Sequence, residues 1–360
     1  MFSLIFTALL IGLGIGLSFI TSSHIALIIV MFLIGLGLII KGGDLFVDAA
    51  SDIAEKSGVP KFIIGATIVS VATTLPEMVA SITGTVDGAL GLAVGNAIGS
   101  VTANTGMIMA ISIMFMPAII KRKEYAFKSI LLMLVTASLL FVLFNGSLNI
   151  WESIIVILFF ASFIWENIAS AKLAQTEVDN IEQKEEEKIE EENNEKKNKL
   201  KFDKALILNL LSFVVGAAGI FFGAKYLVSS GTSIATTLGV SEDVIGLTLV
   251  AIGTSLPELV TTITAIIKKQ SALSVGNIIG ANIIDMSLIL PICAFVSPGG
   301  ELILDSMQTV YLDLPVSLGI MMVLLIPMLI RKKFSRLQGI IALLIYIAYL
   351  VVIVGGFITF

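Results

Sequence analysis

The sequence has few of the residues that carry most redox and acid–base chemistry. It has 360 residues, with one cysteine, Cys293, one histidine, His24, and only 14% charged residues. A single cysteine excludes an intrachain disulfide framework, and we expect Cys293 to fill space in an apolar helix. The net charge of −5 does not indicate a nucleic-acid partner, because residues 172–204 alone contribute −3 of it, with 8 basic and 11 acidic side chains.

Apolar residues, in contrast, are abundant. They make up 57% of the chain, whose mean hydropathy is +1.03, and this excludes a water-soluble enzyme. Long apolar runs with internally bonded backbone are typical of membrane-spanning helices. The chain is therefore predicted to be an all-α polytopic membrane protein. Eleven spans are predicted, at residues 2–20, 25–57, 61–84, 89–118, 125–144, 149–171, 205–238, 243–267, 272–297, 308–330 and 337–358.

Several segments differ from ordinary transmembrane spans. Residues 1–22 are predicted to be a retained extra transmembrane helix rather than a signal peptide, because no charge precedes Ser22 and no clear cleavage site follows. Spans 25–57 and 205–238 exceed the roughly 20 residues that a perpendicular helix needs, so we expect strong tilt or an amphipathic continuation. Residues 172–204 are predicted to be a charged, solvated linker, partly helical or disordered.

The two halves of the chain share unusual polar strings. When Gly65 is aligned with Gly246, GATIVSVATTLPEMVASIT (65–83) matches GLTLVAIGTSLPELVTTIT (246–264) without a gap, and the same register places GNAIG (95–99) on GNIIG (276–280). This similarity indicates duplication. It divides the protein into two five-helix repeats, residues 25–171 and 205–358, which together form a ten-helix core.

The basic residues predict how the repeats are oriented. Cytoplasmic loops concentrate Lys and Arg, and of 14 basic residues outside the linker, 12 are assigned to alternate loops. These are Lys56, Lys61, Lys121, Arg122, Lys123, Lys128, Lys268, Lys269, Arg331, Lys332, Lys333 and Arg336. The linker is thus predicted to be cytoplasmic and the C-terminus to be outside. Since five spans are an odd number, the second repeat must be inverted relative to the first, as in many secondary transporters.

Three carboxylates stand well inside apolar runs: Glu77, Glu258 and Asp285. An ionisable group there costs several kcal/mol unless it is paired, hydrated or bound to a cation. A structural salt bridge to Lys41 or Lys225 is one alternative. Repeat symmetry argues against it, because Glu77 and Glu258 are equivalent whereas Lys225 corresponds to Asp44.

The residues around each glutamate suit a hard cation. Thr73 and Thr74 precede Glu77 by four and three positions and so share its helix face, and Thr254 and Ser255 do the same for Glu258. Pro76 and Pro257 lack an N–H and are predicted to free carbonyls near Ala72 and Gly253. Carbonyl, hydroxyl and carboxylate oxygens are ligands that Ca²⁺ takes in sets of six to eight, so the two half-sites are expected to face each other.

The following spans carry further polar residues. Gly91, Gly95 and Gly99, and Gly276 and Gly280 in the second repeat, are predicted to permit close helix approach. The amides of Asn96 and Asn277 are expected to brace unwound backbone. Ser100 and Asn104 lie further along the first of these spans, and packing alone does not explain Asn104 and Asp285, which are predicted to be buried.

At these residues the sequence resembles the calcium/cation antiporter superfamily, and within it the sodium/calcium exchanger family. ATTLPE (72–77) and GTSLPE (253–258), each followed by GN-x-x-G, carry the resemblance, in which residues 65–104 are the alpha-1 motif and 246–285 the alpha-2 motif. The family would bind Ca²⁺ at Glu77 and Glu258, which would share Na⁺. The remaining ligands that it implies are Ser70 and Ala251 through backbone carbonyls, Thr73, Thr74, Thr254 and Ser255 through hydroxyls and carbonyls, Ser100 for Na⁺, and Asn104 and Asp285 to complete the cluster.

Two positions depart from the family pattern. Ala281 stands where a serine equivalent to Ser100 is usual, and Val101 stands where asparagine is common. The resemblance implies a Na⁺/Ca²⁺ antiporter of the cell membrane that works by alternating access, with no cofactor besides the transported ions and no enzymatic activity. Exchange coupled to H⁺ or K⁺, transport of another divalent cation, and a passive cation channel remain alternatives at this stage.

Overall fold

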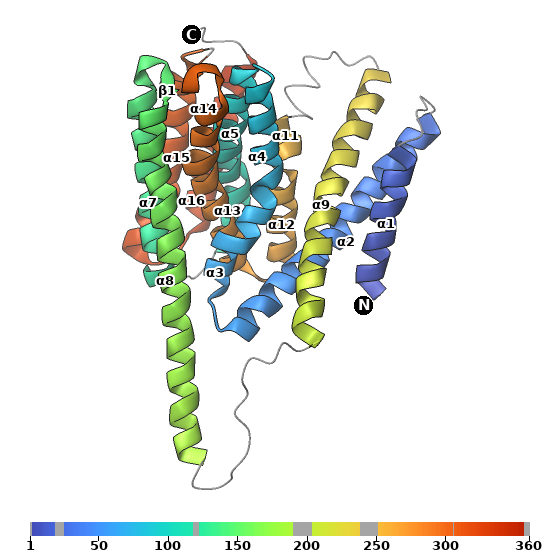
Figure 1. The fold of residues 1–360 in the computed structure, drawn as a ribbon, viewed down its shortest axis with the longest axis vertical. Coiled ribbons are helices and arrows are strands. Elements are labelled where there is room, and N and C mark those ends of the chain that lie inside the picture. The colour runs from blue at the N-terminus through green and yellow to red at the C-terminus, as the bar shows by residue number, and fades with distance from the viewer. Residues whose placement is uncertain are drawn as a thin grey trace.

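The computed structural model describes residues 2–18, 25–117, 122–189, 204–237, 251–304 and 306–355, and these are almost entirely helical (Figure 1). A leading helix, α1 (Phe2–Ser18), precedes the first repeat. That repeat consists of α2 (Ile25–Ser57), α3 (Lys61–Ile64), the π-helix η1 (Gly65–Val69), α4 (Ser70–Val86), α5 (Leu90–Ala103), the π-helix η2 (Asn104–Met109), α6 (Ala110–Phe115), α7 (Arg122–Val142), the 3₁₀ turn η3 (Leu143–Asn145) and α8 (Ile150–Ile189).

The second repeat follows the same plan. Its first helix, α9 (Lys204–Thr237), is separated from the next described helix by residues 238–250, which lie outside the described part of the chain. The remaining elements are α11 (Ala251–Thr254), α12 (Leu256–Ile267), α13 (Ser271–Ile284), the π-helix η5 (Asp285–Ile289), α14 (Leu290–Val296), the 3₁₀ turn η6 (Pro298–Gly300), the π-helix η7 (Thr309–Asp313), α15 (Leu314–Arg331) and α16 (Arg336–Val354).

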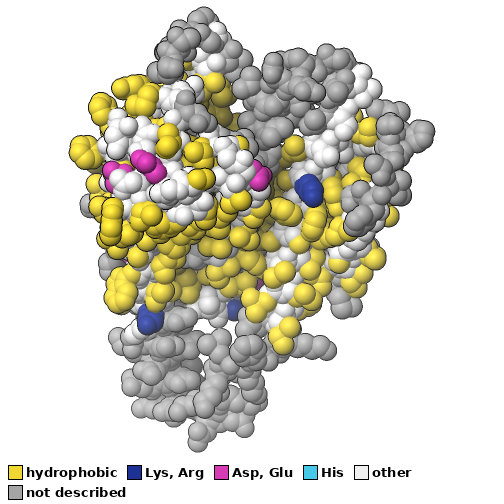
Figure 2. Space-filling view, turned by 45° about the horizontal axis from the view of Figure 1, so that its top comes forward, with side chains coloured by type: hydrophobic (Ala, Val, Ile, Leu, Met, Phe, Trp, Pro, Cys, Tyr) yellow, Lys and Arg dark blue, Asp and Glu magenta, His cyan; other side chains and the backbone are white. Residues whose placement is uncertain are grey.

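The apolar helices match the predicted spans. Nine helical segments of the described chain are long and apolar enough to cross a bilayer, and residues 3–17 and 256–267 form two shorter apolar helices. Figure 2 shows a surface that is largely hydrophobic, with few charged side chains. The prediction of a polytopic helical membrane protein is therefore confirmed. The predicted start of one span, residues 243–250, lies outside the described residues.

Of the two longest predicted spans, one is steeply inclined, as expected. Helices α2 and α9 have 33 and 34 residues, or about 50 Å each at 1.5 Å per residue, against a hydrocarbon core of about 30 Å. Figure 1 shows α2 steeply inclined and crossing α9, with α1 beside them. Helix α8 also continues to Ile189, so the first part of the predicted linker is helical; residues 190–203 lie outside the described ranges.

Backbone geometry follows the repeat. The π-helices η2 and η5 begin at the repeat-related residues Asn104 and Asp285. Gly88 and Lys269, which are also repeat-related, both have positive φ, 81° and 57°. The same backbone hydrogen bonds close both turns, since the N–H of residue 89 donates to the carbonyl of residue 84 and that of residue 270 donates to residue 265. Lys269 thus adopts a left-handed conformation that favours glycine, because its turn must match that of the first repeat.

Glycines let α2 and α9 cross at backbone contact. A Cβ placed on Gly35 would lie 2.9 Å from the carbonyl oxygen of Gly223, and one on Gly42 would lie 2.9 Å from that of Gly216. Gly35 and Gly216 are repeat-related, as are Gly42 and Gly223. Each contact therefore maps onto the other when the repeats are exchanged, and the crossing lies on the pseudo-twofold axis of the fold.

A second close approach joins α13 to the start of the α4 span. A Cβ on Gly276 would lie 2.2 Å from the carbonyl oxygen of Phe62, and one on Gly280 would lie 2.6 Å from that of Ala66. The predicted close packing is confirmed for these two glycines. At Gly95 and Gly99 an added Cβ meets no described atom within 4 Å, and the start of the segment that symmetry would place against them, residues 246–250, is outside the described chain.

Two features differ from the sequence prediction. Two short strands, β1 (Ser147–Asn149) and β2 (Glu301–Ile303), pair antiparallel and join the α7–α8 and α14–α15 loops. Lys128 lies in α7 with a fully buried side chain rather than in a loop. Its ammonium pairs with the carboxylate of Glu166 on α8 and donates to the carbonyl of Glu124 at 3.3 Å. The loop assignment was wrong because a partner on the neighbouring helix, distant in sequence, compensates the charge.

Substituting Gly276 tests the contact between α13 and α3. Gly276→Ala should lower the melting temperature of the purified protein by an amount corresponding to about 1–3 kcal/mol, because the new Cβ overlaps a backbone carbonyl. The matched control is Gly319→Ala in α15, where a Cβ meets no described atom within 4 Å. Equal melting of the two variants in detergent would contradict this contact.

The pair of Lys128 and Glu166 gives a second prediction. Lys128→Met should destabilise the protein by about 2–3 kcal/mol, somewhat less than for a fully buried pair, since the Glu166 side chain is 16% exposed. Adding Glu166→Gln should recover most of the loss by removing the unpaired charge. The measurement is thermal unfolding of wild type, single and double variants; a double variant no more stable than Lys128→Met would refute the compensation.

Candidate cation-binding site

Four segments supply the predicted site residues. Ser70, Thr73, Thr74 and Glu77 lie on α4; Ser100 lies on α5 and Asn104 begins η2; Ala251 and Thr254 lie on α11, Ser255 caps α12 and Glu258 follows on it; Asp285 begins η5. Helix α4 contacts both α12 and η5, and α5 contacts both α11 and η5. The fold therefore brings segments of the two repeats together around these residues.

The three carboxylates lie inside this group. The side chains of Glu77, Glu258 and Asp285 are buried, with 1%, 0% and 0% of each residue exposed. Glu77 is within electrostatic reach of both other carboxylates. None of their six oxygens has a hydrogen-bond partner among the described residues. Three carboxyl groups are thus buried together, and no basic side chain of the described residues pairs with them.

The salt-bridge alternative is wrong. In the described part of the chain no ion pair reaches these carboxylates. The Lys41 ammonium instead lies 3.8 Å from the Asp44 carboxylate, on its own helix and partly exposed. Lys225 is exposed on α9. Burying a charge without a partner is costly, so this cluster is suited to a group that brings positive charge with it.

Hydroxyl groups line the same region unequally. Thr73 is buried and its Oγ1 donates to Asn277 Oδ1 at 3.1 Å, which links the repeats. Ser255 Oγ donates to Ser100 Oγ at 3.2 Å, a second link. Thr74 Oγ1 is buried without a partner among the described residues. Thr254, also predicted as a ligand, is only partly buried.

The side-chain amides take two roles. Asn96 Nδ2 donates to the Glu77 backbone carbonyl at 3.1 Å and to Ser81 Oγ at 2.9 Å. It therefore braces backbone near the first glutamate, but this backbone is helical rather than unwound as predicted. Asn277 does not repeat this arrangement, since its oxygen accepts from Thr73. Asn104 Nδ2 donates to the side-chain oxygen of Asn282 at 3.1 Å, and this leaves Asn104 Oδ1 buried and unpartnered in the described chain.

The prolines act differently in the two repeats. The helix of the second repeat is interrupted at Ser255, two residues before Pro257, which lies in the first turn of α12. Helix α4 instead continues through Pro76. The helix is therefore interrupted beside the proline only in the second repeat. In both places the missing proline N–H leaves a carbonyl without its usual helical donor.

Two residues of the site were not predicted. Asn282 orients Asn104, yet its repeat equivalent is Val101, so comparison of the repeats gave no reason to select it. Thr261 lies three positions after Glu258, and its Oγ1 is buried and unpartnered within the described ranges. Helical spacing alone could have identified Thr261, because residues at that spacing share a helix face.

The available oxygens suit a hard cation. Several buried side-chain oxygens at the site have no hydrogen-bond partner among the residues that the structure describes. They are both carboxylate oxygens of Glu77, Glu258 and Asp285, together with Thr74 Oγ1, Thr261 Oγ1 and Asn104 Oδ1. In the described chain no three His, Cys, Asp or Glu side chains are grouped closely enough to hold a metal ion alone. Carboxylates would therefore need hydroxyl, amide and carbonyl oxygens beside them, a mixture that Ca²⁺ accepts.

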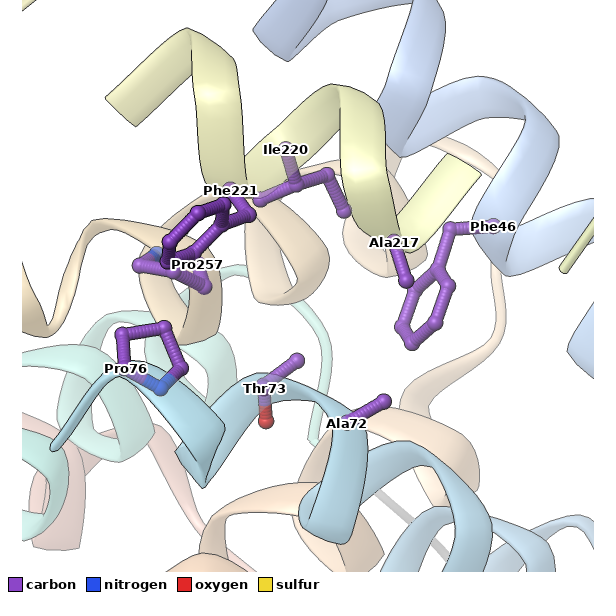
Figure 3. Close-up of a pocket in the computed structure, with 8 residues that line it drawn as sticks. All are labelled: Phe46, Ala72, Thr73, Pro76, Ala217, Ile220, Phe221 and Pro257. Carbon is purple, nitrogen blue, oxygen red and sulfur yellow. The ribbon is translucent and has the colours of Figure 1, made fainter. Parts of the chain in front are cut away.

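A small hollow connects the site to the crossing helices. Figure 3 shows Pro76 and Thr73 of α4 on one side of it, with Pro257 beside Phe221 and Ile220 of α9 across from them and Phe46 of α2 at one end. About 10 Å³ is open to a water-sized sphere, roughly the space for one water molecule. Thr73 also lines the hollow. The layer over the site on this side is therefore apolar and belongs to α2 and α9.

Known proteins share this organisation. The family described as "Sodium/calcium exchanger protein" matches residues 27–168 and 208–355. The sodium/calcium exchanger MaX1 of Methanosarcina acetivorans is 33% identical over 90% of this chain and 97% of its own length. The inner membrane protein YrbG of Escherichia coli is 32% identical over 75% of this chain and 80% of its own length.

Solved structures agree with these relatives. The sodium-calcium exchanger NCX_Mj superposes with a TM-score of 0.75 at 27% identity, over 90% of this chain and 98% of that one. The family match covers both repeats, from the α2 span to α16, and includes every predicted site residue. The chain belongs to the sodium/calcium exchanger family.

Proposed function

We propose that this protein exchanges Na⁺ for Ca²⁺ across a membrane by alternating access, with overlapping ion sites between Glu77 and Glu258. The observation that carries the proposal is the group of three buried carboxylates, drawn from both repeats and lacking any counter-charge in the described chain. Both ions need the same carboxylates, so binding of one displaces the other. The names of the relatives MaX1 and NCX_Mj support the choice of ions.

The proposed ligand roles are based on those that the family resemblance implies. Glu77 and Glu258 bind Ca²⁺, together with oxygens of Thr73 and Thr254. Na⁺ uses the same glutamates, with the hydroxyls and carbonyls placed along α4, α5 and α11. These additional Na⁺ ligands are Ser70, Thr74, Ser100, Ala251 and Ser255. Asn104 and Asp285, which begin the two repeat-related π-helices, complete the centre of the cluster, and π-helices are frequent at functional sites.

Alternating access depends on the inverted repeats. Helices α2 and α9 cross as a symmetric pair and supply the apolar side chains over the hollow beside Thr73. Movement of this pair relative to the core closes the site to one side and opens it to the other, while the carboxylates remain in place.

Orientation and location complete the proposal. The protein lies in the cell membrane, with residues 172–204 in the cytoplasm and the C-terminus outside. The distribution of Lys and Arg supports this orientation, and eleven of the twelve basic residues still support it after Lys128 is set aside. The activity is transport rather than chemical catalysis, and it needs no resident cofactor because Na⁺ and Ca²⁺ are cargo.

Flux measurements test the ion site. Glu77→Ala and Glu258→Ala should each lower Na⁺-gradient-driven Ca²⁺ uptake into proteoliposomes more than about tenfold, since a lost charged ligand is worth more than about 1.4 kcal/mol. Glu301→Gln, on β2, is the control and should transport normally. Unchanged flux in either site variant would reject the assignment. Imposing H⁺ and K⁺ gradients singly, without Na⁺, would identify a different coupling ion if either drove uptake.

Ala281 makes the two ends of the site unequal. Ser100 and Ser255 form a hydrogen bond at one end, whereas the repeat-related pair is Ala281 and Thr74, and Thr74 Oγ1 has no partner in the described chain. Ala281→Ser should supply the missing hydroxyl and lower the Na⁺ concentration for half-maximal exchange by about two- to tenfold, which corresponds to about 0.5–1.5 kcal/mol. Ala281→Val adds volume without a hydroxyl and should not do so. Equal Na⁺ dependence of the serine variant and wild type would contradict this role.

A further inference from the structure

Two acid–base pairs are related by the repeat, and the acid and the base exchange positions between them. Asp44 on α2 corresponds to Lys225 on α9, and Lys268 in the α12–α13 turn corresponds to Asp87 in the α4–α5 turn; both correspondences follow the register that aligns the two glutamates of the site. A contact between Asp44 and Lys268 therefore maps onto a contact between Lys225 and Asp87. Both contacts join an acid to a base, with the charges exchanged between crossing helix and turn.

One of these pairs is formed. Lys268 Nζ lies 3.4 Å from Asp44 Oδ1 and 2.8 Å from Asp48 Oδ1. Partial burial lowers the pKa of the Lys268 ammonium, but the hydrogen bond to Asp48 and the charges of Asp48 and Asp44 outweigh that effect and raise the pKa overall. Gly43 lies beside these contacts, and a Cβ there would come 2.8 Å from Thr264 Oγ1. Helix α2 is thus seated on the end of α12.

The repeat-related pair is apart. Asp87 and Lys225 are both exposed, and no ion pair within 4 Å joins either of them to the other or to another residue that the structure describes. The α4–α5 turn lies at the upper end of the bundle in Figure 1, and the α12–α13 turn lies at the lower end. The formed and unformed pairs are therefore on opposite faces of the protein.

We propose that Asp44–Lys268 and Lys225–Asp87 are two electrostatic latches that form alternately as the site opens to one face and then to the other. The first holds α2 against α12 while the lower face is closed. The second holds α9 against the α4–α5 turn while the upper face is closed. The four residues position the moving helices and do not bind the transported ions. The proposal rests on the alternating access proposed above.

Symmetry explains why both members of the pair change sign between the repeats, rather than only one. If only one residue of the first pair had its sign exchanged in the second repeat, the repeat-related contact would be repulsive, and the opposite closed state would be penalised. Exchanging both signs keeps the attraction on each face. The two latches also differ in which element carries the acid, because α2 supplies it in the first and the α4–α5 turn supplies it in the second.

The strength of such a pair suits a latch. Partly exposed ion pairs are weak and are screened by salt, so a latch of this kind biases the two states without locking either. Neutralising one member should change their ratio by about two- to fivefold. A fivefold change corresponds to about 1 kcal/mol.

Sided transport tests the proposal. In proteoliposomes with defined orientation, Lys268→Gln should favour the state open to the lower face, which lowers the Ca²⁺ concentration for half-maximal transport there and raises it on the upper face by about two- to fivefold. Lys225→Gln should have the opposite effect. The matched control is Lys269→Gln, in the same turn as Lys268, and it should match wild type.

Cross-linking provides a second measurement. In a Cys293→Ala background, Asp44→Cys with Lys268→Cys and, separately, Asp87→Cys with Lys225→Cys should each cross-link in the transporting protein and arrest it. Failure of the second pair to cross-link would overturn the proposal, as would a shift in the same direction for Lys268→Gln and Lys225→Gln or no shift beyond that of Lys269→Gln. Any of these contrary results would leave Na⁺-driven exchange by the wild-type protein intact. If the proposed function were wrong, the wild-type protein would show no such exchange.

Discussion

The cost of burying negative charge organises this protein. Glu77, Glu258 and Asp285 are almost fully enclosed, and no lysine or arginine of the described chain forms an ion pair with them. Fixing a buried charge without compensation costs several kcal/mol. Packing elsewhere in the fold offsets that cost. Close backbone contacts at Gly65 and Gly276, for example, hold α13 against the segment that leads into α4. A cation that enters the cluster removes the penalty, so ion binding and the stability of the closed site are coupled.

Inverted repetition explains how one such cluster can serve two faces. The backbone obeys the repeat closely, in the paired π-helices, in the paired turns at Gly88 and Lys269, and in the crossing of α2 with α9. Side chains depart from it where the two conformations or the two ends of the site must differ. Ala281 against Ser100 is one departure, and Lys268 against Asp87 is another. Backbone symmetry makes two states accessible, and side-chain asymmetry sets how much each is populated.

Much of the fold and site could be predicted because a membrane makes sequence patterns unusually informative. The register of the two repeats predicted that Glu77 and Glu258 are equivalent and face each other, and their burial together with Asp285 confirms that all three carboxylates lie inside the protein. What escaped prediction depends on contacts distant in sequence. Lys128 is buried because Glu166 is there to pair with it, and β1 forms because β2 lies beside it. Asn282 was missed because its repeat equivalent is valine.

The placement of the apolar hollow adds a constraint on the transport cycle. Phe46, Ile220 and Phe221 cover Thr73 and the two prolines without offering a polar side-chain atom. An ion leaving the carboxylates on this side would lose ligands without gaining water until α2 or α9 moves. Since those helices cross at glycine contacts that bring their backbones together, they are best able to move as one body. In the proposed cycle, release of the ion and movement of the helix pair are thus one step.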